Sequence, residues 1–206
     1  MMLSKPHIFS TLIGSGYFVG VGLPILLISV GGVGCLVMAV PAVSLILLAL
    51  SMAVSIELYF LIVGVSTRGI QSQGRFSPSH VLRHVQNASH ILMIASVLFP
   101  LWIMGILIVR LFKPPHVEVN LVFITAVLMI LINGAAAILL QSTTCRNKHF
   151  ESRFGLFKKL LIPSCIALMG GVTAMLLDAG LLIDDIGALL IMGWFMYSAR
   201  LEDLGI

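Results

Sequence analysis

Apolar residues fall into six long runs that polar segments separate. A helix needs about 20 mostly apolar residues to cross the ~30 Å hydrocarbon core of a bilayer, and these runs approach or exceed that length. They predict membrane-spanning helices at about residues 8–30, 35–65, 88–109, 117–140, 160–177 and 181–199. We therefore expect an all-α, polytopic bundle of six transmembrane helices, forming a single domain over residues 1–206 without a soluble C-terminal domain.

The first two runs are longer than a signal peptide or a single span requires. A single lysine precedes the first run, as in a signal peptide, but the run exceeds the usual apolar length of such peptides, so we expect a retained helix. The second run is too long for one perpendicular span, because its 31 residues would reach about 46 Å as a helix. It must tilt, break near Pro41 or project into water.

Composition narrows the class of protein. Hydrophobic residues make up 59% of the chain and charged residues only 10%, whereas soluble domains carry about a quarter charged residues. This excludes a soluble enzyme or a nucleic-acid-binding protein. The sequence also lacks the metalloprotease, serine-hydrolase and P-loop motifs, so we expect neither enzymatic activity nor a bound cofactor. The three cysteines show no disulfide or zinc spacing.

The connections between the predicted spans alternate between basic and weakly charged segments. Of the twelve lysines and arginines, only Arg110 and Lys113 fall on one side, which also holds Glu118. The other ten are Lys5, Arg68, Arg75, Arg83, Arg146, Lys148, Arg153, Lys158, Lys159 and Arg200. Cytoplasmic loops carry the excess of basic residues. This pattern predicts that both termini are cytoplasmic, in an inner or plasma membrane.

Three polar residues inside the apolar runs are candidates for a transport pathway: Glu57, His90 and Asn133. Glu57 is either an ion or proton site near mid-depth or a carboxylate on a helix end that protrudes into the cytoplasm. His90, with His80 and His84, is either a metal ligand or a solvated interfacial residue. Asn133 is expected to form an interhelical hydrogen bond.

Other features favour packing over chemistry. Asp178, Asp184 and Asp185 bracket the short outer loop before the last span, where they are either solvated loop acids or a vestibule that attracts cations. The Gly16-x-x-x-Gly20 motif would let another helix approach the first span, as in a homodimer or a hetero-oligomer. Prolines within the predicted spans are expected to kink them; they are Pro24, Pro41, Pro100 and Pro163.

One stretch resembles the cation diffusion facilitator family. Arg110, Pro114, Pro115, Val117 and Asn133 match the arginine, proline-containing outer loop and mid-span asparagine at that family's junction of spans three and four. Weaker similarity covers residues 79–83, 184–190 and 197–200, with Asp185 where the family has a proline. The resemblance implies a six-span membrane fold with cytoplasmic termini and efflux of a divalent, zinc-type cation, with or without coupling to protons.

The sequence departs from that family at the metal site. Family members carry aspartate and histidine ligands on spans two and five, whereas the corresponding positions here are Pro41, Ser44 and Leu48, and Lys158 or Lys159 followed by Ile162 or Pro163. We therefore assign no metal-ligating residue. The sequence leaves two hypotheses: a cation transporter that uses Glu57, His90 and Asn133, or a transport-inactive scaffold or partner subunit of a membrane complex.

Overall fold

The computed structural model describes residues 22–72, 78–144 and 153–203, and over these ranges the chain is all-helical, without strands. It contains six helices in the described residues. They are α3 (Leu23–Ala42), α4 (Leu45–Ser72), α5 (Pro78–Phe112), α6 (Val119–Thr144), α7 (Arg153–Leu177) and α8 (Gly180–Asp203).

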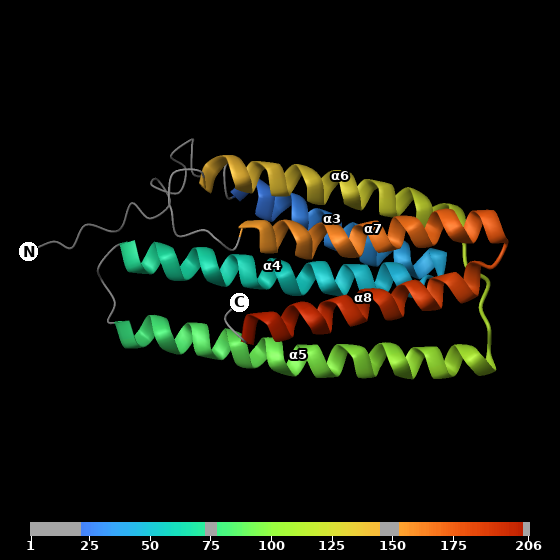
Figure 1. The fold of residues 1–206 in the computed structure, drawn as a ribbon, viewed down its shortest axis with the longest axis horizontal. Helices are drawn as coiled ribbons and strands as arrows, with labels where there is room; N and C mark the ends of the chain where they lie inside the picture. Colours follow the sequence, from blue (N-terminus) through green and yellow to red (C-terminus); the bar gives the residue numbers. More distant parts are fainter. Residues whose placement is uncertain (1–21, 73–77, 145–152, 204–206) are drawn as a thin grey trace, which may run out of the picture.

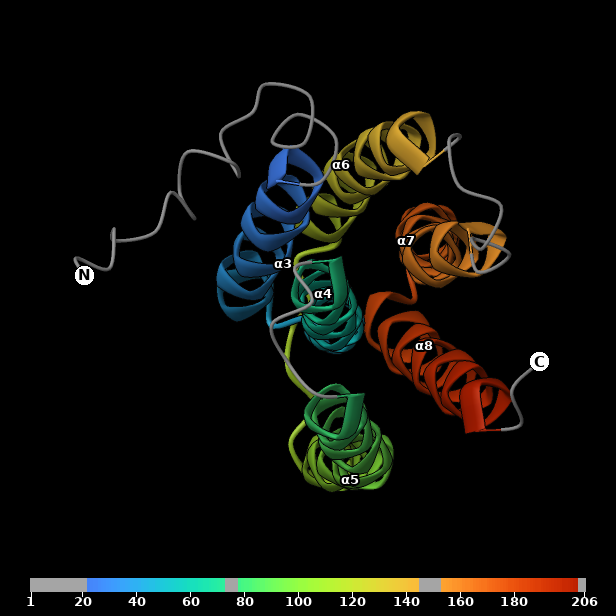
Figure 2. The ribbon, with the colours of Figure 1, turned by 90° about the vertical axis from the view of Figure 1, so that its left-hand side faces the viewer.

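The helices lie side by side, and each runs in the direction opposite to the one before it (Figure 1). Three connections meet at one end of the bundle, which we call the short-loop end: residues 43–44, 113–118 and 178–179. Helix α4 occupies the centre (Figure 2) and contacts each of the other five described helices. Helix α5 lies at the edge of the bundle, against α4 and α8.

The boundary between the first two predicted spans was wrong. We expected the chain to leave the first span near residue 30 and to begin the second at Cys35, but α3 runs without a break through this region. The turn falls instead at Val43 and Ser44, shortly after Pro41. The over-long second run therefore breaks near Pro41, which was one of the three expected outcomes. Its remaining part belongs to the 28-residue helix α4.

Local chemistry explains why the helix ends there. Val43 adopts a left-handed conformation (φ 50°), and the amides of Val43 and Ser44 donate to the carbonyls of Val40 and Ala39, which closes the C-terminus of α3. The Ser44 hydroxyl then accepts a hydrogen bond from the amide of Leu47 at 3.2 Å. Serine is a preferred N-cap residue, so Ser44 starts α4 directly after α3 ends.

Side-chain hydrogen bonds also join α3 to α4. The thiol of Cys35 donates to the Leu47 carbonyl at 3.3 Å, and the hydroxyl of Ser51 donates to the Gly32 carbonyl at 2.9 Å. Hydrogen bonds of this kind join helices where water cannot compete for the same groups. These bonds join about one turn of α3 (Gly32 and Cys35) to about one turn of α4 (Leu47 and Ser51).

The remaining four predicted runs are confirmed as helical, with shifted ends. Helices α5, α6, α7 and α8 cover most or all of the predicted runs 88–109, 117–140, 160–177 and 181–199 and extend beyond them, mainly at the end opposite the short loops. The extensions are helical although their residues are polar, because intrahelical hydrogen bonding continues outside the apolar segment. Apolar content alone therefore underestimated the length of these helices.

The prolines do not all have the expected effect. Pro24 lies in the first turn of α3, where a missing amide donor is tolerated, so no kink is required there. Pro41, Pro100 and Pro163 lie inside helices. Gly16 and Gly20 lie outside the described residues.

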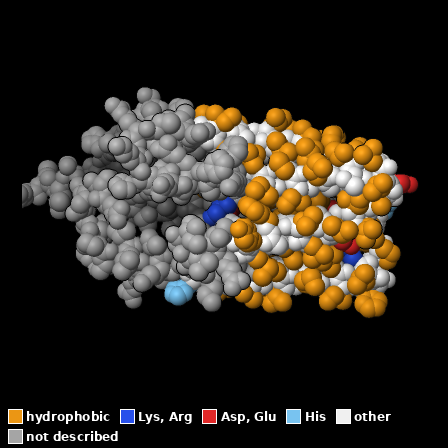
Figure 3. Space-filling model, viewed as in Figure 1, with side chains coloured by type: hydrophobic (Ala, Val, Ile, Leu, Met, Phe, Trp, Pro, Cys, Tyr) orange, Lys and Arg blue, Asp and Glu red, His pale blue; other side chains and the backbone are white. Residues whose placement is uncertain are grey.

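Four described helical segments are long and apolar enough to cross a membrane. They are Leu23–Ala42, Val119–Leu139, Lys159–Leu177 and Gly180–Ser198. The apolar segments in α4 and α5 are shorter, Leu45–Tyr59 and Val97–Phe112. Hydrophobic side chains are spread over the whole described part of the face in Figure 3, with few charged ones between them. A soluble protein rarely exposes so large an apolar area, and these helices indicate a membrane protein.

Candidate functional site

A charged cluster is buried at the short-loop end, where three helices meet. Arg110 comes from the last turn of α5, and Asp184 and Asp185 come from the beginning of α8. Only 7% of Arg110 and 3% of Asp184 are exposed. Burial of charge costs several kcal/mol per ion unless partners compensate for the lost water, so the contacts of this cluster decide whether the arrangement is stable.

Asp184 caps the N-terminus of the central helix α4. Its Oδ1 accepts hydrogen bonds from the Ser44 hydroxyl at 2.6 Å and from the Ile46 amide at 3.2 Å. Its Oδ2 accepts from the Leu45 amide at 2.6 Å. The first amides of a helix have no intrahelical partner, and the helix dipole favours a negative charge there. One carboxylate from α8 therefore accepts hydrogen bonds from the first amides of α4, which would otherwise lack a partner.

Arg110 compensates this carboxylate from the other side. Its Nη1 lies 2.8 Å from Asp184 Oδ2 and also contacts Oδ1 of Asp185, while Nη2 donates to the carbonyl of Val43. The guanidinium thus bonds to α8 and to the α3–α4 turn at once. The guanidinium can bond to several acceptors at once because its N–H donors are held in a rigid planar arrangement. A lysine ammonium lacks this fixed geometry. We call Arg110, Asp184, Asp185 and Ser44 the Arg110–Asp184 network.

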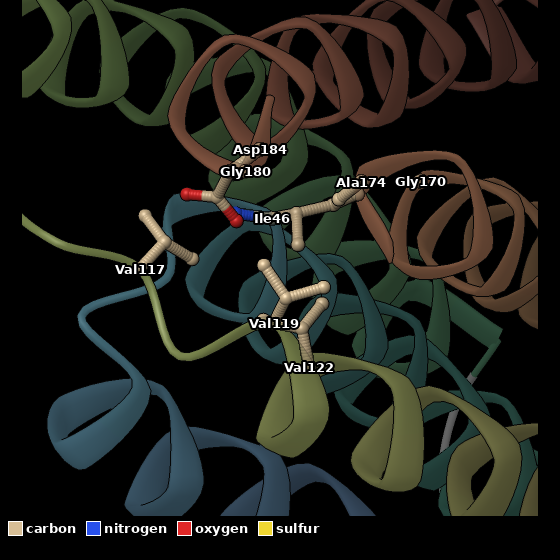
Figure 4. Close-up of a pocket in the computed structure, with 8 residues that line it drawn as sticks. All are labelled: Ile46, Val117, Val119, Val122, Gly170, Ala174, Gly180 and Asp184. Carbon is tan, nitrogen blue, oxygen red and sulfur yellow. The ribbon is translucent and has the colours of Figure 1, made fainter. Parts of the chain in front are cut away.

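A small apolar cavity lies next to this network, between α4, α6, α7 and α8 (Figure 4). Its volume is about 10 Å³, which is close to the space that one water molecule requires. It is lined by Ile46, Val117, Val119, Val122, Gly170, Ala174, Gly180 and Asp184. Asp184 is the only charged residue in this lining, so the carboxylate forms a wall shared by the network and the cavity.

Ile46 fills the space between α7 and α8 beside the cavity. Its Cδ1 lies 2.7 Å from the position that a Cβ on Gly170 would occupy and 2.1 Å from the corresponding position on Gly187. A side chain at either glycine would therefore overlap with Ile46, which is only 1% exposed. The two glycines let α7 and α8 approach the first turn of α4.

Glu57 lies within the bundle, on the central helix. It is twelve residues after Leu45, about 18 Å along α4 from the short-loop end, and only 8% of it is exposed. Helix α4 continues for another 15 residues to Ser72, and its apolar segment, Leu45–Tyr59, ends two residues after Glu57. Both interpretations of Glu57, an ion or proton site and a carboxylate at the cytoplasmic side, stay predictions.

Asn133 forms the interhelical hydrogen bond that its sequence position predicts. It is fully buried in α6, and its Nδ2 donates to Ser164 Oγ on α7 at 2.9 Å. The Leu160 carbonyl is a weaker acceptor at 3.4 Å, and Ser164 Oγ itself donates to this carbonyl at 3.0 Å. The amide thus joins α6 to α7 away from the Arg110–Asp184 network.

We expect Ser164→Ala to lower the free energy of unfolding by about 0.6–1.7 kcal/mol, the range found for hydrogen bonds between membrane helices. Thr173→Ala removes a hydroxyl from the same helix that bonds only to its own helix, at the Met169 carbonyl, and should change stability little. Equilibrium unfolding in mixed detergent micelles measures both variants. Equal effects would mean that the Asn133–Ser164 bond does not join the helices energetically.

The three pathway candidates do not form one cluster. Glu57 is on α4, His90 on α5 and Asn133 on α6, and α5 and α6 lie on opposite sides of α4 (Figure 2). The side chain of His90 is exposed. The side chains of His80 and His84 lie outside the described part of the chain.

The main residues that sequence reasoning missed are Asp184 and Arg110. The outer acids were expected most readily as solvated loop residues, but the loop comprises only residues 178–179, and Asp184 is buried in α8. Only Asp178 is exposed. A signal was present: Asp184 lies inside the predicted span 181–199, and a buried acid in a membrane segment needs a cation partner. Arg110, at the end of another span, is that partner.

Metal-binding side chains do not gather in the described residues: no group of three histidine, cysteine, aspartate or glutamate residues lies close enough to hold an ion. Of the cysteines described, Cys35 is buried and Cys165 is exposed, and both are free thiols. Cys145 lies outside the described residues. The Arg110–Asp184 network is therefore a structural ion pair at a helix start and lacks the composition of a metal site.

In comparisons with known proteins, no family model matches the chain and no curated protein matches it significantly. Function must be inferred from the chain itself. Two features carry that inference: the buried carboxylate of Glu57 and the buried Arg110–Asp184 network.

Proposed function

We propose that the chain is a six-span protein of the inner or plasma membrane with both termini in the cytoplasm. The alternating directions of the six described helices support this arrangement. So does the distribution of charge, because Arg110 and Lys113 lie at the short-loop end and the other ten basic residues occupy segments joined to the opposite end. The short-loop end then faces outward.

Within this arrangement, we propose that the protein transports a cation and that Glu57 is the residue that exchanges protons and charge. The observation that carries the proposal is the burial of Glu57, at 8% exposure, about 18 Å into the central helix. Ionisable residues inside membrane segments are costly and commonly belong to ion pathways or proton relays. A carboxylate here can carry a proton when the cation is absent and balance part of its charge when it is present.

The nature of the cation comes from the resemblance of residues 110–133 to cation diffusion facilitators. It favours efflux of a zinc-type divalent ion in exchange for protons. Glu57 supplies one oxygen ligand of the type that binds such ions, and the remaining ligands would have to be carbonyls, hydroxyls or water. The proposal therefore assigns a pathway residue and no closed metal site.

Reconstitution into liposomes tests the transport proposal. Purified protein should take up zinc in response to an imposed pH gradient, and Glu57→Gln should reduce the initial rate at least tenfold, because the amide cannot exchange a proton. Glu118→Gln is the matched control: Glu118 is exposed at the short-loop end, and its loss should leave the rate unchanged. Equal rates in the wild type and Glu57→Gln would overturn the role of Glu57.

A second candidate is a transport-inactive scaffold or partner subunit, either as a homodimer or with another membrane protein. The observation in its favour is the missing group of metal ligands in the described residues, together with a cavity that is apolar apart from Asp184. Purification in mild detergent separates the two candidates. Stoichiometric recovery of a second membrane protein, with no zinc uptake by the isolated chain, would support the scaffold.

A further inference from the structure

The Arg110–Asp184 network lies where it could control access to the bundle. It connects the outer ends of α5 and α8 to the start of α4 and to the α3–α4 turn. The cavity begins directly behind it, and Asp184 belongs to both. Entry to the bundle from the short-loop end would therefore pass the carboxylate of Asp184.

We propose that the Arg110–Asp184 network is a gate at the short-loop end and that the adjoining cavity is the closed form of a vestibule. This inference rests on the proposed transport function, since a gate implies a pathway. In the closed form the carboxylate is held by Arg110, the Ser44 hydroxyl and two backbone amides of α4. In the open form α8 moves away from α4, and water replaces these partners.

The chemistry of the contacts supports a gate that can open. Apolar surfaces pulled apart have no alternative partner for their contacts, but a carboxylate and a guanidinium that separate are solvated by water. Water is close at hand, because Lys113, Pro114 and His116 in the adjoining connection are exposed. The charged groups of the network thus have hydrogen-bond partners in both arrangements, from each other in the closed form and from water in the open form. A two-state element requires two such arrangements.

The residues behind the gate are suited to a change in separation between helices. The Ile46 side chain fits between Gly170 of α7 and Gly187 of α8, and the Ile46 amide donates a hydrogen bond to Asp184 of α8. Movement of α8 would break that bond and withdraw Gly187 from Ile46. The same displacement therefore opens the polar network and enlarges the apolar cavity.

Thiol labelling from outside measures this opening. In a variant without native cysteines (Cys35→Ala, Cys145→Ser, Cys165→Ser), Val122→Cys places a reporter on the cavity wall, where Val122 is 4% exposed. A membrane-impermeant maleimide should label it slowly. Adding Asp184→Asn should raise the labelling rate about tenfold or more, because the rate follows the population of the open form.

Two further reporters distinguish gating from loss of structure. Ala136→Cys is a buried position on α6, about 21 Å from Val122 along the same helix, and it should stay unlabelled when the gate opens. His116→Cys is exposed at the short-loop end and should label equally in every background. Lys113→Ala removes an exposed cation outside the network and should leave the Val122→Cys rate unchanged.

The outcomes separate the proposals. Faster labelling at Val122→Cys alone supports the gate, and Arg110→Lys, which keeps the charge but loses the planar arrangement of donors, should give a smaller increase in the same direction. Faster labelling at both Val122→Cys and Ala136→Cys would show that the network only holds the fold together. No change at either position would show that it does not control access. The labelling rates do not depend on zinc flux. The labelling experiment can therefore refute the gate without refuting transport, and the uptake experiment can refute transport without changing the labelling result.

Discussion

Replacing Arg110 by alanine is expected to lower the free energy of unfolding by about 3–5 kcal/mol, the cost of removing one member of a buried ion pair. Asp184 would keep its hydrogen bonds from α4 but lose its counter-ion, and the carbonyl of Val43 would lose a donor. The carboxylate of Asp185 contacts the same guanidinium, so both acids would lose this cation. Equilibrium unfolding of the purified protein in mixed micelles measures the loss.

Lys113→Ala is the matched control for Arg110→Ala. Lys113 is three residues further along the chain, carries the same charge and is exposed, so its loss should change stability by a few tenths of a kcal/mol at most. The double replacement Arg110→Leu with Asp184→Asn should recover part of the loss, because it leaves no uncompensated charge from that pair. If Arg110→Ala matches Lys113→Ala in stability, the buried ion pair does not stabilise the bundle.

Replacing Ile46 by alanine is expected to cost about 2–5 kcal/mol, as for other fully buried aliphatic residues. Ile46 is 1% exposed and fills the space between Gly170 and Gly187, beside an existing cavity. The Arg110–Asp184 network holds the beginning of α8 against the start of α4, so α8 cannot easily move into this space. The melting temperature of the purified protein is the simplest measure.

A double-mutant cycle tests the contact itself. Gly187→Ala alone should destabilise, because its new Cβ would lie 2.1 Å from Ile46 Cδ1. Ile46→Val removes that atom and leaves Cγ1 at 3.0 Å, so the double variant should be more stable than the sum of the single effects predicts. Gly193→Ala is the control on the same helix, with nothing within 4 Å of its Cβ position. Additive effects of Ile46→Val and Gly187→Ala would contradict the packing described for this site.

The helices that could be predicted are those whose apolar runs end at polar segments. Runs 88–109, 117–140, 160–177 and 181–199 each lie largely within one helix, because hydrocarbon thickness and helix rise fix the length of a span. The first boundary could not be found in this way. Residues 31–34, which separate the first two predicted spans, remain helical, and the turn uses Val43 in a left-handed conformation that β-branched residues rarely adopt.

The candidate site was only partly visible in the sequence. The partner of Asn133 could be expected in general, since a buried amide in a membrane helix needs one, but nothing in the sequence identified Ser164. Asp184 and Arg110 are 74 positions apart, so their pairing depends on how the helices pack. The position of Glu57 along its helix became clear only once the α3–α4 turn was placed at Ser44, which moved the start of that helix.

The most direct test of the account is proton movement during zinc uptake. Proteoliposomes loaded with a pH-sensitive dye, without an imposed pH gradient, should show a change in internal pH when zinc is added outside. The change should appear with the wild type and Glu118→Gln and be absent with Glu57→Gln. Zinc uptake by the wild type without proton movement, or proton movement that persists in Glu57→Gln, would contradict the claim that Glu57 exchanges protons for the cation.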